Sequence, residues 1–179
     1  MVWAALFALN AVKVKINGEG GDVKLVRSKK ELRLDCKMFG KMGEGACGTV
    51  HYAEYRGIKC VAKKGKVMEG ETESDALDRI VREALNLYKV NGAGGAPRLW
   101  ALARDAPIFI MSLCEGKDLT HIHYSKNFSE KKLSQIFLSI GISLSELHAA
   151  GCVHNDIKRN NLVIGKNPDK TFKAHIIDL

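Results

Sequence analysis

Four polar side chains near the carboxyl end of the chain have the types and the spacing that phosphoryl chemistry needs. Residues 154–161 read HNDIKRNN, and Asp178 follows near the last residue. Asp156 could accept a proton from a hydroxyl, and Lys158 could neutralise a phosphoryl group during its transfer. Asn161 and Asp178 could hold Mg²⁺ through oxygen, the donor atom that this ion prefers. The residues therefore predict a site for group transfer to a hydroxyl.

A glycine-rich segment, residues 43–50, reads GEGACGTV and could cradle phosphates. Its glycines let backbone N–H groups approach an anion without obstruction by side chains. A dinucleotide fingerprint would lead into a helix and a Walker loop would end in Gly-Lys-Ser/Thr, but here a strand-like run follows. We therefore predict a glycine turn between two antiparallel strands. A tight hairpin with no ligand is the alternative.

A lysine pair, Lys63 and Lys64, follows Ala62 on the next predicted strand. Alternate residues of a strand share a face, so Ala62 and Lys64 point together and Lys63 points the other way. A small residue beside a flat ring and an ammonium beside phosphate favour Lys64 over Lys63 as the functional lysine. Glu83, within a predicted helix, could hold that ammonium in place. The alternatives are a solvated lysine and an exposed helical glutamate.

The hydrophobic pattern predicts how these segments are positioned. Strands are expected at residues 31–36, 50–56, 59–64, 98–102 and 108–113 because apolar residues alternate or cluster there. A 3.6-residue period predicts a helix over 74–91, with Ser74 as N-cap and Gly92 as its stop. A second helix after Ser129 has the apolar stripe Leu133, Ile136, Phe137, Ile140, Leu144 and Leu147. Residues 162–164 and 171–178 should form a hairpin around 165–168.

The order of these elements favours an α+β fold in two lobes, with the boundary at residues 115–117. The five chemical segments, in this order, resemble the protein-kinase family. They correspond to its G-x-G-x-x-G-x-V loop, its V-A-x-K strand, its helical Glu, its H-x-D-x-K-x-x-N loop and the start of D-F-G, over residues 43–179. The resemblance implies an N-terminal extension at 1–32, a small antiparallel β lobe with one helix at 33–114, and an incomplete, mainly helical lobe at 115–179.

The resemblance also implies ligands and residue roles. ATP and Mg²⁺ would be the cofactors, and a protein Ser/Thr hydroxyl would be the acceptor, because Lys158 is typical of the serine/threonine branch. Lys64 would contact the phosphates and pair with Glu83. The other implied positions are Gly43, Gly45 and Gly48 over the phosphates, Val50 and Ala62 around adenine, Met111 as gatekeeper with Ser112, Leu113 and Cys114 at the adenine edge, Asp156 at the hydroxyl, Lys158 at the γ-phosphate, and Asn161 and Asp178 at Mg²⁺.

Three residues depart from the family pattern. Cys47 stands at the loop tip where an aromatic is common, Asn155 replaces the usual catalytic-loop Arg, and Leu179 replaces Phe. The chain also stops within the last motif. These features predict a partial kinase domain that, alone, exposes a hydrophobic patch and is poorly soluble or inactive. A nucleotide-binding or scaffold module without catalysis is the main alternative.

The amino-acid composition excludes several other classes of protein. Hydrophobic residues make up 46% and charged residues 27%, which excludes disordered and collagen-like chains. Five scattered cysteines without a C-x-x-C pair predict a reducing, cytoplasmic location. The apolar start, residues 1–9, is too short to span a membrane and lacks a basic region before it, so a signal peptide is only an alternative.

Two further functions are alternatives: nucleic-acid binding and metal-dependent oxygenation. The net charge is +8, and residues 1–69 hold 14 Lys/Arg against 7 Asp/Glu. Such a basic region could bind nucleic acid, but no interleaved aromatic motif accompanies it, so we expect none to bind. His154, Asp156 and His175 could mimic the ligand set of a metal oxygenase, which would leave the glycine segment unexplained.

Overall fold

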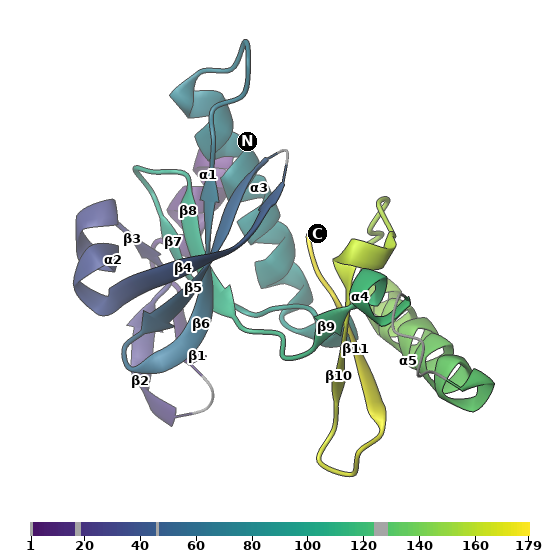
Figure 1. Cartoon of the computed structure of the whole chain (residues 1–179). Coiled ribbons are helices and arrows are strands. Elements are labelled where there is room, and N and C mark those ends of the chain that lie inside the picture. Colours follow the sequence, from purple (N-terminus) through teal and green to yellow (C-terminus); the bar gives the residue numbers. More distant parts are fainter. Residues whose placement is uncertain (1, 17–18, 46, 124–128) are drawn as a thin grey trace. The chain divides into compact units, whose positions relative to one another are not determined.

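The computed structural model describes residues 2–16, 19–45, 47–123 and 129–179 (Figure 1). The chain forms two compact units. The first combines Met1–Leu85 with Leu99–Leu113, and the second combines Asn86–Arg98 with Cys114–Leu179. The division at Leu113 lies near the boundary predicted at 115–117. Residues 86–98, by contrast, group with the second unit.

Within the described residues, a six-stranded sheet forms the centre of the first unit, in the order β3-β7-β8-β6-β5-β4. Its strands run antiparallel except for β3, which pairs parallel with β7. Their bounds are β3 Val26–Arg27, β4 Cys36–Gly45, β5 Gly48–Tyr55, β6 Ile58–Gly65, β7 Leu99–Ala103 and β8 Ile108–Ser112. The strands predicted at 50–56, 59–64, 98–102 and 108–113 are therefore confirmed, with ends shifted by one or two residues.

The strand predicted at 31–36 is wrong: α2 covers Lys29–Asp35 as a helix. Ser28 caps it, since its hydroxyl accepts a hydrogen bond from the Glu31 amide while the Glu31 carboxylate accepts one from the Ser28 amide at 2.6 Å. This reciprocal capping box stabilises a short helix whose alternating apolar residues are equally compatible with a strand. Only Leu32 of this helix is buried.

The segment before β4 is an integral part of the first unit. It consists of α1 (Val2–Leu9) and the antiparallel hairpin β1 (Lys13–Ile16) and β2 (Glu19–Lys24), followed by β3 and α2; Met1 lies outside the described residues. The amide of Leu102 on β7 donates to the Leu25 carbonyl at 2.9 Å. Ile16, Val23 and Leu32 join the core cluster around Trp100. Described residues of the predicted N-terminal extension, 2–16 and 19–32, thus contribute to the same core and sheet as the strands that follow them.

We expect the Leu32→Ala substitution to lower the free energy of unfolding by about 3 kcal/mol, because it empties a buried site in this core. Leu32 is 4% exposed. Leu34, two residues along the same helix, is 80% exposed, so Leu34→Ala should cost less than about 0.5 kcal/mol. Urea denaturation of both variants measures the difference. Equal midpoints would contradict the burial of Leu32 in this core.

The helix α3, Glu73–Val90, confirms the prediction over 74–91. Its cap is Thr72 rather than Ser74, because the Thr72 hydroxyl accepts from the Asp75 amide and the Asp75 carboxylate accepts from the Thr72 amide at 2.8 Å. Gly92, at φ 89°, follows the helix end in the left-handed conformation that glycine adopts freely.

The second unit is built on α5, Glu130–Ala149, which Ser129 caps as predicted. The hairpin of β10 (Leu162–Lys166) and β11 (Phe172–Ile176) packs beside it and confirms the predicted hairpin. Ser143 donates to the Ala174 carbonyl at 3.0 Å, which ties the helix to β11. The short strand β9 (Lys117–Asp118) and the helix α4 (Leu119–His123) complete the unit, with 3-10 turns at Ala93–Gly95 and Arg159–Asn161.

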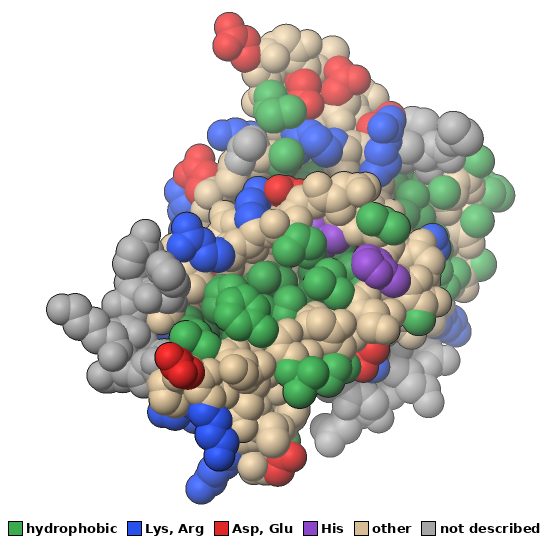
Figure 2. Space-filling view, turned by 90° about the vertical axis from the view of Figure 1, so that its right-hand side faces the viewer, with side chains coloured by type: hydrophobic (Ala, Val, Ile, Leu, Met, Phe, Trp, Pro, Cys, Tyr) green, Lys and Arg blue, Asp and Glu red, His purple; other side chains and the backbone are tan. Residues whose placement is uncertain are grey.

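Hydrophobic side chains remain exposed on α5. Of the predicted apolar stripe, Ile136, Ile140 and Leu147 are buried, whereas Phe137 is 62% exposed. Leu138 and Ile142 are also more than half exposed. Figure 2 shows hydrophobic side chains gathered on the face of the molecule that lies to the right in Figure 1. No helix among the described residues is long and apolar enough to cross a membrane.

Candidate active site

The glycine-rich segment forms the turn between β4 and β5, as predicted. Gly45 pairs with Gly48 and Gly43 with Val50; Ala46 lies outside the described residues. A Cβ on Gly48 would lie 2.2 Å from the Lys64 carbonyl oxygen, so only glycine fits against β6. Gly43 and Gly45 have nothing within 4 Å of such an atom. Their backbone is therefore open to a ligand.

The lysine that pairs with Glu83 is Lys63, not Lys64. The Lys63 ammonium lies 2.6 Å from Oε1 of Glu83, and their side chains are 9% and 14% exposed. Lys64 is exposed on the opposite face of β6. The predicted alternation of the strand was correct, but the face was assigned wrongly. Ala62, on the face of Lys64, packs into the sheet core, which leaves the other face for α3 and Glu83.

The same register corrects the expected adenine contacts. Residues directly opposite in an antiparallel pair point to the same face. Val50 is opposite Lys63 and His51 is opposite Ala62, so Val50 and Ala62 point to opposite faces and cannot enclose one ring. Val61, which is opposite Met111 on β8, shares the face of Val50 and Lys63. The sequence analysis does not predict Val61 as a contact of the adenine ring, because the smaller side chain of its neighbour Ala62 is the better match to a flat ring.

The Lys63–Glu83 pair is held in a largely desolvated environment. Burying either charge alone is costly, whereas a close pair offsets much of that cost. Each residue therefore fixes the other, and α3 is tied to the middle of the sheet through this contact. Such a fixed ammonium is suited to bind an anionic group at the open edge of the glycine turn.

In the second unit, Asp156, Lys158 and Asn161 lie together, as predicted. Oδ2 of Asp156 is 2.6 Å from the Lys158 ammonium, and Nδ2 of Asn161 donates to the Asp156 carbonyl at 3.0 Å and to Oδ2 at 3.3 Å. The hydrogen bond from Lys158 is the main cause that lowers the pKa of Asp156 below its ordinary value. The carboxylate is therefore ionised at neutral pH and can accept a hydrogen bond from a hydroxyl.

His154 is hydrogen-bonded to the backbone on both sides of its ring. Its Nδ1 accepts from the Asp156 amide at 3.2 Å, and its Nε2 lies 2.8 Å from the Ile177 carbonyl. The two partners assign the proton to Nε2, which donates to that carbonyl. His175 instead contacts the Gly95 carbonyl at 2.7 Å. The two histidines are thus held by separate backbone carbonyls, and no group of three or more metal-ligating side chains forms among the described residues.

Asn161 and Asp178 are brought to the same end of the hairpin. The Ile177 amide donates to the Asn161 carbonyl at 3.0 Å, so Asp178 follows directly after this contact. Asn161 is 4% exposed, and its amide nitrogen is fixed toward Asp156. That leaves its side-chain oxygen for another partner. An amide oxygen and an exposed carboxylate are a donor set that fits Mg²⁺.

Known proteins resemble this chain over the region that contains the segments described above. A sequence model described as "Protein kinase domain" matches residues 36–179. The chain belongs to the protein kinase family. MAP kinase-interacting serine/threonine-protein kinase 1 of Xenopus laevis is 29% identical over 146 residues, which cover 76% of this chain and 33% of that protein. Aurora kinase of Candida albicans is 28% identical over 148 residues, covering 77% of this chain and 27% of that protein.

A dual specificity protein kinase, zakA of Dictyostelium discoideum, is 29% identical over 143 residues, covering 74% of this chain and 17% of that protein. This kinase chain thus spans a third or less of the length of these relatives. The family match also replaces the metal-oxygenase hypothesis, because it accounts for the glycine-rich segment and for Lys63 together.

The match begins at Cys36, where β4 starts. Residues 1–35 of this kinase chain therefore precede the family domain, although Leu32 and β3 belong to the same core and sheet as the strands that match.

Proposed function

We propose that this kinase chain binds Mg-ATP and transfers the γ-phosphoryl group to Ser or Thr of a protein. The observation that carries the proposal is the cluster of Asp156, Lys158 and Asn161, because a nucleotide-binding scaffold needs no ionised carboxylate held by a lysine and an amide. Asp156 orients the acceptor hydroxyl and takes its proton, while Lys158 supports the charge on the transferred group.

Nucleotide binding is assigned to the first unit. Backbone amides of Gly43, Gly45 and Gly48 cover the phosphates, and Lys63 replaces Lys64 as the phosphate ligand, with Glu83 holding it in place. The adenine ring contacts the face shared by Val50 and Val61, and Met111 and Leu113 lie at its edge.

Asn161 and Asp178 would hold Mg²⁺, whose charge offsets that of the phosphate oxygens. Asn161 is suited to this role because its nitrogen is already engaged by Asp156. The assignment of Asp178 is supported by its place in the chain, directly after Ile177, whose amide donates to the Asn161 carbonyl.

A serine/threonine acceptor is supported by Lys158 and by the similarity to MAP kinase-interacting serine/threonine-protein kinase 1 of Xenopus laevis. The five cysteines are all free thiols, which supports a reducing, cytoplasmic location.

Labelling tests the proposal directly. The chain is incubated with γ-labelled ATP, a generic basic protein substrate and Mg²⁺, and phosphorylated sites are mapped by mass spectrometry. The cluster of Asp156, Lys158 and Asn161 is complete in this chain, so we expect label on Ser and Thr in spite of the sequence-based expectation of an inactive fragment, and loss of that label when EDTA removes Mg²⁺. Nucleotide binding without any transfer would favour the scaffold alternative, and label confined to Tyr would contradict the acceptor assignment.

Asn155 leads to a prediction about regulation. It occupies the left-handed conformation at φ 60°, which asparagine tolerates, and its side chain is exposed. The family arginine at this position reads a phosphorylated activation segment, and an uncharged amide cannot pair strongly with such a phosphate. We expect phosphatase treatment of active enzyme to change its rate by less than about twofold. A loss of turnover would contradict this.

A further inference from the structure

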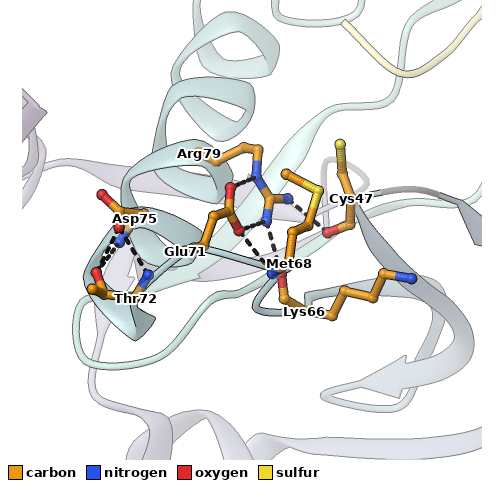
Figure 3. Close-up of polar contacts among 7 residues, drawn as sticks. All are labelled: Cys47, Lys66, Met68, Glu71, Thr72, Asp75 and Arg79. Atoms are coloured by element: carbon orange, nitrogen blue, oxygen red, sulfur yellow. Dashed lines mark hydrogen bonds and ion pairs between the residues drawn. The ribbon is translucent and has the colours of Figure 1, made fainter.

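The tip of the glycine-rich turn is anchored to α3 by one side chain. Arg79 donates through Nη1 to the Cys47 carbonyl at 2.7 Å and through Nη2 to the Lys66 carbonyl at 2.8 Å. Figure 3 shows the guanidinium at the centre of these contacts. One side chain of α3 therefore joins the turn between β4 and β5 to the residue that follows β6.

Glu71 orients this guanidinium. Its carboxylate accepts from Nε of Arg79 at 3.3 Å and from Nη2 at 2.9 Å, and it also accepts from the Met68 amide at 3.0 Å. The side chains of Arg79 and Glu71 are 23% and 20% exposed. The hydrogen bonds from Arg79 lower the pKa of Glu71, so the acid stays ionised. A planar fork held on one side by a carboxylate presents its remaining donors in a fixed direction.

The contact at the turn uses the backbone of Cys47. The Lys66 amide donates to the same carbonyl at 3.3 Å, so this oxygen has two donors. The printed hydrogen bond from Arg79 thus goes to a backbone carbonyl, which every residue carries, and the Cys47 thiol adds a further interaction with the guanidinium.

Arg79 and Glu83 are one helical turn apart, so they project from neighbouring positions on α3. Arg79 holds the phosphate-covering turn, and Glu83 holds Lys63. A displacement of α3 relative to the sheet would strain both contacts at once.

We propose that Arg79 is a positioning residue that fixes the glycine-rich turn in the same frame as the Lys63–Glu83 pair. This inference rests on the proposed function, since it assigns the turn to nucleotide. An anchored turn binds phosphate without first losing its own freedom, which strengthens binding.

Two measurements on the whole chain test the anchor. Hydrogen exchange follows the Lys66 amide, which donates to the anchored carbonyl, and calorimetry follows the affinity for Mg-ATP. In Arg79→Met we expect the Lys66 amide to exchange about tenfold faster and Mg-ATP to bind about tenfold more weakly. Arg79→Lys, which keeps the charge but loses the fork, should lie between wild type and Arg79→Met.

Arg82 provides the matched control, because it is an exposed arginine on the same helix. Arg82→Met should change neither measurement by more than about twofold. Cys47→Ser should also leave both within about twofold of wild type, since the hydrogen bond from Arg79 is made to the backbone and the serine hydroxyl can still accept from the guanidinium. Unchanged exchange of core amides such as Phe109 shows that each variant is folded.

The possible outcomes distinguish the anchoring of the turn by Arg79 from its effect on nucleotide binding. Unchanged exchange of the Lys66 amide in Arg79→Met would overturn the anchor. Faster exchange with unchanged Mg-ATP affinity would overturn its role in nucleotide binding. If the wild-type chain binds no nucleotide, the proposed function fails, while faster exchange would still support the anchor itself.

Discussion

Asp156→Asn should lower the rate of phosphoryl transfer by about 10³-fold while leaving Mg-ATP affinity within about threefold of wild type. The substitution keeps the shape of the side chain but removes the charge that attracts the hydroxyl proton. The Lys158 ammonium, now 2.6 Å from a carboxylate oxygen, would face a neutral amide. Single-turnover labelling measures the rate, and calorimetry measures the affinity.

Asp169→Asn is the matched control, because Asp169 lies in the turn between β10 and β11 and its pKa is also lowered, mainly by the Thr171 hydroxyl. It should leave the rate within about twofold of wild type. Equal rates for wild type and Asp156→Asn would remove Asp156 from the mechanism. A large loss of nucleotide affinity in Asp156→Asn would instead indicate a structural role for the turn.

The long elements could be predicted because their pattern is unambiguous. Over 18 residues, α3 repeats its apolar positions with the period of a helix and no strand fits that pattern. The seven residues of α2 give no such discrimination, since Leu32 and Leu34 alternate as they would in a strand. The missed signal was Ser28 followed by Glu31, a capping box that sequence alone displays.

The sequence predicts which residue types form the candidate site, but not which face of a strand each side chain occupies. The residues of the turn at 154–161 are close in sequence, so their grouping follows from spacing alone. The choice between Lys63 and Lys64 depends on which face of β6 meets α3. That is decided by packing across the sheet, where Ala62 belongs to the buried core cluster that also contains Trp100.

Arg79 could not be predicted from residue types at all. Its partners at the turn and after β6 are backbone carbonyls, which every residue carries. Only the folded positions of Cys47 and Lys66 bring these oxygens together, so an arginine four residues before Glu83 gives no signal by itself.

Lys63→Met should weaken Mg-ATP binding by about 100-fold and lower the free energy of unfolding by about 3 kcal/mol. The affinity falls because the phosphate ligand is lost. The stability falls because the Glu83 carboxylate, whose side chain is 14% exposed, is left without its cation. Calorimetry and urea denaturation measure the two effects.

Lys64→Met is the control that the chain itself offers, since it removes the same charge one residue away. Lys64 is exposed on the opposite face of β6, so this variant should change affinity by less than about twofold and stability by less than about 0.5 kcal/mol. The double substitution Lys63→Met with Glu83→Gln should recover part of the stability but none of the affinity, because it neutralises the carboxylate that has lost the Lys63 ammonium without restoring a phosphate ligand. If Lys64→Met instead showed the larger loss of affinity, Lys64 rather than Lys63 would be the phosphate ligand, as the alternation of residues in the sequence predicts.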